Sequence, residues 1–356
     1  MKGSMNVVDL FCGAGGLALG FKRAGYRVLL GLDVDWDAVR TFALNNPESA
    51  WINKDIRKVT GEEILDAIKG RGDVDIVIAG IPCEGYSLLN RRYDPSDPRN
   101  YLFMEFMRVV RILKPKAVLI ENVPGLVRRE NGAFRESIES ALRDLGFTTR
   151  SFMMNALDYG IPQKRTRLFF VGTCSSSRFE PPKPTHGFQD LLPFTHPERV
   201  KPYLTVRDAI SDLPPLEPGE EKGYYESEPR NDYQRAMRGG CVKLCNHRAP
   251  KHPEWTVKLI EGTRTGHPLY KTFKQRIRLD WGEPSPTIPA GGVRPQWFFA
   301  HPEQPRGLTV REVARLQSFP DSYVFEGSLI KQRILVGDAV PPLLAEALAR
   351  KLAEYI

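Results

Sequence analysis

Stretches typical of short buried strands alternate with helical stretches from the start of the chain to about residue 172. The clearest apolar strands are predicted at 6–11, 27–34, 75–80 and 116–123. Apolar residues spaced three and four apart predict a helix between the last two of these strands. Strands that alternate with helices are typical of a parallel, doubly wound sheet, so the sequence predicts an α/β fold.

The pattern changes after the strand predicted at 168–172. Residues 174–285 are rich in Pro and Gly and keep their aromatic residues, which indicates a loop-rich second domain rather than disorder. Helical order returns with a capping box at Thr309 and an amphipathic helix at 341–355. We expect a first domain at 1–174, a second at 175–285, and a segment at 286–356 that returns to the first domain.

Positive charge is concentrated inside the predicted second domain. The whole chain has a net charge of +8, whereas residues 230–278 carry 12 Lys and Arg against 3 Asp and Glu, a net charge of +9. Tyr233, Trp255, Tyr270 and Phe273 lie among these bases. Basic and aromatic residues together can contact phosphates and stack on bases, which favours a nucleic-acid partner. A solvated, loop-rich face is the alternative interpretation.

Several classes of protein are disfavoured. No apolar run reaches the roughly 18 residues that a membrane span needs, and residues 1–11 lack the long apolar region of a signal peptide. The five cysteines are odd in number and widely scattered, which argues against a disulfide scaffold and for the cytoplasm. Cys241, Cys245, His247 and His252 do not have a standard zinc spacing, so we predict no metal site.

A glycine-rich turn follows the first predicted strand. It reads Phe11-Cys12-Gly13-Ala14-Gly15-Gly16, and a helical pattern comes next. Such a turn at the carboxyl edge of a sheet can bind a nucleotide-like cofactor, although it is also a common structural device. Asp33 ends the second strand and could accept both hydroxyls of a ribose, and Asp55 could meet an adenine amino group.

A thiol and a carboxyl lie at the ends of two neighbouring strands. Cys83 follows the strand 75–80, and Glu121 ends the strand 116–123. A lone cysteine is more often a small buried apolar residue. Beside a carboxyl at the same sheet edge, however, it forms a plausible pair of nucleophile and acid.

These segments together resemble the DNA cytosine-5 methyltransferase family, of the kind found in bacterial and archaeal restriction-modification systems. The matching segments occur in the family's order, and they are Asp9–Gly16, Pro82-Cys83, Glu121-Asn122-Val123, Gln163–Arg167, Arg311–Asp321 and Gly337–Pro342. The resemblance implies a Rossmann-like, S-adenosylmethionine-dependent methyltransferase fold. Residues 1–174 would be the catalytic and cofactor-binding domain, and the loop-rich 175–285 the smaller target recognition domain.

The resemblance also implies a sequence-specific reaction. A cytosine would be flipped out of double-stranded DNA, Cys83 would add to C6, and C5 would accept the methyl group, leaving S-adenosylhomocysteine. Glu121 would hold N3 and the exocyclic amine, and Arg165 would meet O2. Arg167 completes the expected catalytic set.

Three groups of binding residues follow from the resemblance and the charge pattern. The cofactor pocket would be lined by Phe11, Gly13, Asp33, Val34, Asp55, Ile56, Gly80, Pro82, Leu102 and Ala339. A loop at 87–99 would close on the DNA through Ser87, Arg91 and Arg92. The predicted second domain would contribute Arg235, Arg238 and Lys243.

Some positions depart from the family pattern. Glu84 and Tyr86 stand where Gln and Phe are usual, and Asp338 replaces an Asn. Because Glu84 adds negative charge near the thiol, a catalytically weak DNA-binding regulatory protein is one alternative. A tRNA cytosine-5 methyltransferase is another, although the long 174–285 region favours DNA. We expect a monomer that has a restriction endonuclease as its partner and makes no contact with membranes.

Overall fold

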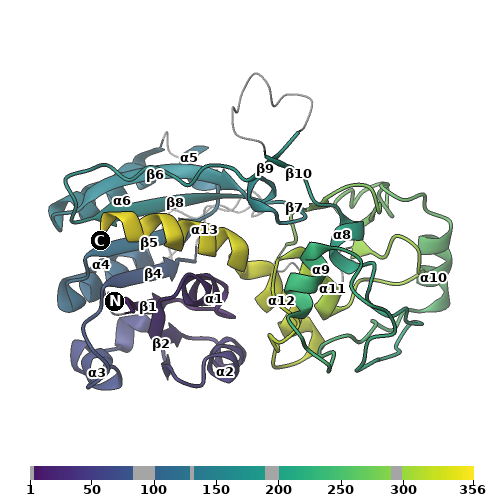
Figure 1. Ribbon diagram of the computed structural model, residues 1–356, viewed down its shortest axis with the longest axis horizontal. Helices are drawn as coiled ribbons and strands as arrows, with labels where there is room; N and C mark the ends of the chain where they lie inside the picture. The colour runs from purple at the N-terminus through teal and green to yellow at the C-terminus, as the bar shows by residue number, and fades with distance from the viewer. Residues whose placement is uncertain (1–3, 83–100, 129–131, 189–199, 290–298) are drawn as a thin grey trace. The chain divides into compact units, whose positions relative to one another are not determined.

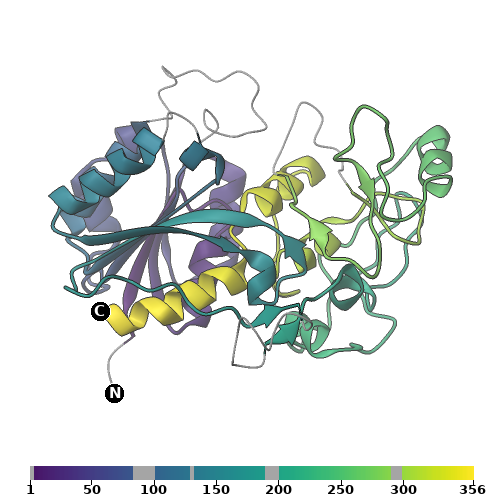
Figure 2. The ribbon, with the colours of Figure 1, turned by 90° about the horizontal axis from the view of Figure 1, so that it is seen from above.

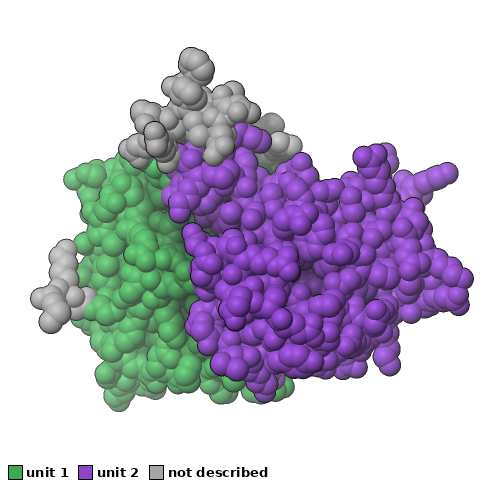
Figure 3. All heavy atoms as spheres, turned by 45° about the vertical axis from the view of Figure 1, so that its right-hand side comes forward, with its two compact units in different colours: residues 1–155, 166–183, 342–356 green, residues 156–165, 184–341 purple. Residues whose placement is uncertain are grey.

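The computed structural model describes residues 4–82, 101–128, 132–188, 200–289 and 299–356. The chain divides into two compact units (Figure 3). Unit 1 comprises residues 1–155, 166–183 and 342–356, and unit 2 comprises residues 156–165 and 184–341. None of the helices within the described ranges is long and apolar enough to cross a membrane.

Unit 1 is built on a seven-stranded sheet with the order β3-β2-β1-β4-β5-β8-β6 (Figure 1). Five strands run parallel: β1 (Asn6–Leu10), β2 (Arg27–Asp33), β3 (Ala50–Asn53), β4 (Ile76–Gly80) and β5 (Ala117–Asn122). The last two strands, β8 (Thr166–Thr173) and β6 (Thr148–Asn155), run antiparallel to their neighbours. The α/β fold is therefore confirmed, with an antiparallel pair at one edge of the predicted parallel sheet. Only ten residues separate β6 from β8, which suits an antiparallel return better than a parallel crossover.

Helices cover both faces of this sheet, as Figure 2 shows. One face packs against α3 (Gly61–Ala67), α4 (Leu102–Leu113) and α6 (Ala133–Asp144) through an apolar cluster that includes Leu10, Leu32, Val77 and Ile120. The other face carries α1 (Gly16–Arg23), α2 (Trp36–Asn45) and α13 (Pro342–Leu352). Because the central strands are covered on both sides, most of their residues are apolar.

The C-terminal helix α13 packs directly on α1. A Cβ placed on Gly20 would lie 2.3 Å from the Ala345 Cβ and 2.7 Å from the Glu346 backbone nitrogen, so this contact requires glycine. The Tyr26 hydroxyl donates to the Ala349 carbonyl at 3.0 Å, and Arg23 pairs with Glu346. The segment 342–356 thus belongs to unit 1. Near its end, the Tyr355 hydroxyl accepts a hydrogen bond from the Glu180 backbone nitrogen.

Unit 2 is rich in loops and held by short elements. Its helices are α8 (Val206–Ile210), α9 (Asp232–Arg238), α10 (Glu254–Glu261), α11 (Val310–Leu316) and α12 (Leu329–Asp338), and its strands have two residues each: β7 (Gln163–Lys164), β9 (His186–Gly187), β10 (Lys201–Pro202), β11 (Ile277–Arg278), β12 (Ser285–Pro286) and β13 (Phe299–Ala300). Residues 286–341, which we expected in a segment packed on the first domain, belong here instead. The reason is α11, which packs against α8 and buries all seven of its residues.

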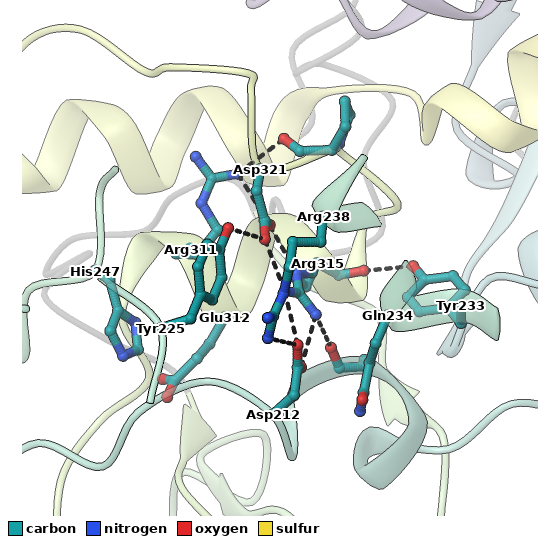
Figure 4. Close-up of polar contacts among 12 residues, drawn as sticks. Asp212, Tyr225, Tyr233, Gln234, Arg238, His247, Arg311, Glu312, Arg315 and Asp321 are labelled. Carbon is teal, nitrogen blue, oxygen red and sulfur yellow. Dashed lines mark hydrogen bonds and ion pairs between the residues drawn. The ribbon is translucent and has the colours of Figure 1, made fainter. Parts of the chain in front are cut away.

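Unit 2 has a charged core. Arg315 lies between two buried carboxylates, with Nη1 2.9 Å from Asp212 Oδ1 and Nη2 2.7 Å from Asp321 Oδ2 (Figure 4). The Tyr225 hydroxyl donates to Asp321 at 2.6 Å. Burial would raise the pKa of Asp321, but the hydrogen bond from the Arg315 guanidinium and its charge hold this pKa below its usual range. Each of these buried charges has a hydrogen-bonded partner, which offsets the cost of its burial. Their contacts join α8, α11 and the loops around them.

Candidate functional site

The glycine-rich turn leaves β1 in an unusual backbone conformation. Phe11, Gly13 and Gly15 have φ values of 60°, 52° and 83°, a region that favours glycine. The turn is closed by a hydrogen bond from the Gly15 nitrogen to the Cys12 carbonyl at 2.8 Å, and the Cys12 nitrogen donates to the Leu32 carbonyl. These bonds place the turn at the carboxyl edge of the sheet, between the ends of β1 and β2. A non-glycine residue with a strained backbone, such as Phe11, is found most often at ligand sites.

Asp33 is tied to this turn at the end of β2. Its Oδ2 accepts from the Gly13 nitrogen at 2.8 Å, and its Oδ1 accepts from the Asp35 nitrogen at 2.9 Å. Burial is the main cause that raises the pKa of Asp33. The next residue, Val34, is 68% exposed although it is apolar. An oriented carboxyl beside an exposed apolar side chain can accept ribose hydroxyls and cover a flat ring.

Asp55 and Ile56, which we expected in the cofactor pocket, follow the end of β3. Asp55 lies two residues beyond the end of β3 and caps the short helix η1 (Ile56–Lys58), with its carboxylate paired to Arg57 at 2.6 Å. That pairing lowers the pKa of Asp55. Ile56 is buried in the apolar cluster of unit 1. The Asp55 carboxylate is thus already bound by a neighbouring cation.

Glu121 is the buried carboxylate at the end of β5. Its Oε1 lies 2.9 Å from the Nε of Arg167, which is on β8. Gly80 stands opposite Glu121 in the β4–β5 register, and a Cβ on Gly80 would lie 3.7 Å from Glu121 Oε2 and 4.0 Å from the Phe11 carbonyl. The glycine-rich turn and the Glu121–Arg167 pair are therefore parts of one site, with Gly80 between them.

The two arginines of the segment 163–167 have different surroundings. Arg165 belongs to unit 2, where its guanidinium is buried and donates to the carbonyls of Ile288, Gly337 and Ala339 at 3.0, 2.8 and 3.0 Å. Arg167 belongs to unit 1 and pairs with Glu121. The role that we expected of Arg165, contact with the base, is better matched by Arg167, because both terminal nitrogens of Arg165 already bind backbone carbonyls.

The remaining predicted residues divide into those that the structure describes and those that it does not. Leu102 starts α4 and is buried, Pro82 is partly buried after β4, and Ala339 caps the end of α12 in unit 2. Cys83, Glu84, Tyr86, Ser87, Arg91 and Arg92 lie outside the described residues.

The three bases predicted to bind DNA differ in accessibility. Lys243 is exposed, and Arg235 has an exposed side chain that pairs with Asp232. The Arg238 side chain is only 11% exposed, and its Nη2 donates to Asp212 Oδ2 at 2.7 Å and to the Ser227 carbonyl at 2.9 Å. Its guanidinium also lies 3.9 Å from the centre of the Tyr225 ring. Arg238 is therefore part of the charged core (Figure 4). We had expected this side chain to contact DNA, but it is bound inside unit 2 instead.

Both histidines of the Cys241–His252 group, which lacks a standard zinc spacing, make structural hydrogen bonds. The His247 imidazole is buried and bonds to Thr309 Oγ1 at 3.0 Å and to the Pro214 carbonyl at 2.9 Å. His252 Nε2 accepts from the Gly307 nitrogen at 2.9 Å. Within the described ranges, no three His, Cys, Asp or Glu side chains are grouped as metal ligands.

One buried titratable residue near the site, Asp9, lies in the first segment that resembles the family but was assigned no role of its own. Asp9 is fully buried in the middle of β1, and burial raises its pKa well above the usual range of a carboxyl. It pairs in register with Gly31 of β2. The available signal was a carboxylate in the centre of an otherwise apolar strand, where a charge is costly.

Comparison with known proteins decides the family. The family model described as C-5 cytosine-specific DNA methylase matches residues 5–354. The chain belongs to this family. It is a DNA cytosine-5 methyltransferase, which confirms both the resemblance and the enzyme class predicted from the sequence.

Its relatives match over almost the whole chain. The type II methyltransferase M.DdeI of Desulfomicrobium norvegicum is 35% identical over 99% of this chain and 89% of its own length. M.AgeI of Thalassovita gelatinovora is 33% identical over 98% of this chain and 99% of its own length. A prophage-encoded protein of E. coli, described as a DNA modification methyltransferase, has a crystal structure with a TM-score of 0.80, 27% identity and 99% coverage of both chains. The Rossmann-like methyltransferase fold is thereby confirmed.

Proposed function

We propose that the site at the carboxyl edge of the unit 1 sheet holds a flipped cytosine against Glu121 while the glycine-rich turn holds S-adenosylmethionine. The observation that carries this proposal is the buried Glu121–Arg167 pair, with Gly80 next to both the Glu121 carboxylate and the Phe11 carbonyl. A base and a cofactor bound on the two sides of Gly80 would be close neighbours. The base must be flipped out because its target atom is inaccessible in a stacked duplex, and the proposal includes a specific DNA sequence as the substrate.

The residues at the turn suit the cofactor. Asp33 presents an oriented carboxyl to ribose hydroxyls, and the exposed Val34 offers an apolar surface to the adenine. Among the described residues, no heavy atom lies within 4 Å of a Cβ built on Gly13, which leaves space beside the turn. When bound, S-adenosylmethionine supplies the methyl group that C5 accepts.

The chain's own residues would prepare the base. The Cys83 thiolate adds to C6, and the electron pair moves toward C5 and N3. Glu121 binds the protonated N3 and the exocyclic amine, and Arg167 holds the Glu121 carboxylate in place. After methylation, loss of the C5 proton re-forms the C5–C6 double bond and expels the Cys83 thiolate.

Transfer of radiolabelled methyl groups tests the proposal. Wild-type protein should label unmethylated genomic DNA, and Cys83→Ala should still bind DNA while it loses methyl transfer. Label on tRNA alone would favour the RNA alternative, and tight DNA binding with no label on any DNA would favour the regulatory alternative. Cys83→Ala with wild-type turnover would overturn the mechanism.

We also propose a setting for the activity. The names of the relatives as type II methyltransferases support a role in restriction-modification, with a cognate endonuclease that cleaves the same sequence when it is unmethylated. The protein would act in the cytoplasm as a monomer. Light scattering on a sizing column measures the molar mass and so tests whether the protein is a monomer. The partnership is tested by asking whether DNA methylated by this protein resists cleavage by the cognate endonuclease.

A further inference from the structure

Residues 266–278 of unit 2 fold back on themselves as a hairpin. The Gly266 nitrogen donates to the Arg278 carbonyl at 2.7 Å, the Arg278 nitrogen to the His267 carbonyl at 3.0 Å, and the Leu269 nitrogen to the Arg276 carbonyl at 2.7 Å. Pro268 and Ile277 form an antiparallel bridge. These bonds leave residues 270–276 as the tip of the hairpin.

The base of this hairpin is firmly anchored. The Arg278 guanidinium donates to the carbonyls of Ile260, Thr263 and Glu303 at 2.9, 3.0 and 3.2 Å, and also to Glu261. Leu269 is buried against Ile260 and Ala300. Because the Arg278 guanidinium donates hydrogen bonds to carbonyls at the end of α10 and near β13, it fixes the base of the hairpin and does not face outward.

The tip carries cations around an exposed aromatic ring. Lys271, Lys274 and Arg276 give residues 270–276 a charge of +3 with no acidic residue. Phe273 is 57% exposed and touches Tyr270 edge-on, with ring centres 6.4 Å apart. The Arg276 guanidinium lies 5.9 Å from the centre of the Tyr270 ring. A single exposed phenyl ring is common on protein surfaces, so it is the place of Phe273 among three cations at the end of an anchored hairpin that points to a nucleic-acid partner.

We propose that this tip enters a groove of duplex DNA and that Phe273 sets part of the sequence specificity. Lys271 and Lys274 would contact phosphates on the two sides of the groove, which the charge of the tip favours. Phe273 would contact base edges, where an aromatic ring can distinguish a thymine by its methyl group. The inference rests on the proposed function, since it assigns a reader to the DNA that the site methylates.

Mapping of methylated cytosines tests the role of Phe273. Wild-type protein, Phe273→Ala and Phe188→Ala would each methylate unmethylated genomic DNA, followed by sequencing of 5-methylcytosine. Phe188 is a phenylalanine of unit 2 outside the hairpin that is 66% exposed, against 57% for Phe273, so it is the matched control. We expect Phe273→Ala to relax the recognised sequence at one base pair, with discrimination there about tenfold lower. An unchanged sequence and unchanged discrimination would overturn the inference.

Salt dependence of DNA binding tests the lysines without requiring catalysis. We expect Lys271→Ala and Lys274→Ala each to weaken binding to all duplex sequences and to reduce the slope of log K against log salt by about 0.9. Slopes equal to that of wild type would contradict the docking of the tip. If wild-type protein leaves all DNA unlabelled, the proposed function fails, and this binding measurement still decides the inference.

Discussion

Glu121 and Arg167 show how single residues acquire their roles from the strands that carry them. Glu121 ends the parallel strand β5, and Arg167 lies near the start of the antiparallel strand β8, so the two side chains meet at one edge of the sheet. Arg165 is only two residues away in sequence, yet it serves the carbonyls around α12 in unit 2. Two arginines of one short motif therefore do different work.

The first residue-scale prediction separates these arginines. We expect Arg167→Ala to lower kcat by roughly 10²- to 10³-fold, because the carboxylate that stabilises the charged ring loses its partner. The Kd for S-adenosylhomocysteine, measured by calorimetry, should stay unchanged. In contrast, Arg165→Ala should lower the free energy of unfolding by about 3 kcal/mol, because it leaves buried carbonyls without donors. An Arg167→Ala enzyme with wild-type kcat would contradict the assignment.

The second residue-scale prediction concerns Asp33. Asp33→Asn removes the negative charge and keeps an acceptor for only one of the Gly13 and Asp35 nitrogens, because these donate to different oxygens of Asp33. We expect the Kd for S-adenosylhomocysteine to rise roughly 10- to 100-fold, since hydrogen bonds to charged groups are the stronger ones. Circular dichroism should show the same fold. If calorimetry gives the wild-type Kd, Asp33 does not bind the ribose.

At the scale of elements, the contact between α1 and α13 joins the two ends of the chain. Gly20 makes it possible, because the backbone of α13 lies where a side chain would be. The glycine-rich turn begins α1, so the position of that turn depends on α13. The C-terminal helix thereby supports the turn at which we propose that the cofactor binds.

We therefore expect Gly20→Ala to lower the free energy of unfolding by about 1–3 kcal/mol through overpacking. Gly61→Ala is the matched control, because the nearest atom to its added Cβ is the flexible end of the Ile112 side chain. Urea denaturation would compare the two. Equal stabilities for both variants would show that α13 can move away from α1 at little cost.

At the scale of the whole molecule, stability depends on buried groups that must stay neutral or paired. His301 is buried, and its Nδ1 accepts from the backbone nitrogens of Glu303 and Gln304 at 3.1 and 3.0 Å. Burial lowers the pKa of His301 to about 4, although the nearby Glu312 opposes this and Arg306 adds to it. Burial likewise lowers the pKa of His252 to about 4.

These histidines predict loss of stability in mild acid. An unfolded histidine binds a proton near pH 6.5, whereas the folded one resists it until about pH 4, so stability falls as the pH drops between these values. Each such group contributes up to about 1.4 kcal/mol per pH unit. Urea denaturation from pH 7.5 to 5 should show the fall, and His301→Asn, which keeps an acceptor in place of Nδ1, should reduce it. The raised pKa values of Asp9 and Asp33 act in the opposite direction, so the test is the difference between wild type and His301→Asn, and equal profiles for the two would contradict the prediction.

The sequence by itself determined the α/β class, the glycine-rich turn with Asp33 at the end of the next strand, and the place of Glu121 at the carboxyl end of a neighbouring strand. These features follow from local patterns, because strand periodicity and turn chemistry depend on residues close in sequence. Only the tertiary structure decided that Glu121 pairs with Arg167, that Arg238 is buried beside Asp212, and that residues 270–276 form an anchored basic tip. Those outcomes depend on contacts between segments far apart in the chain, and a charged residue looks the same in sequence whether its partner is solvent, a carbonyl or a buried carboxylate.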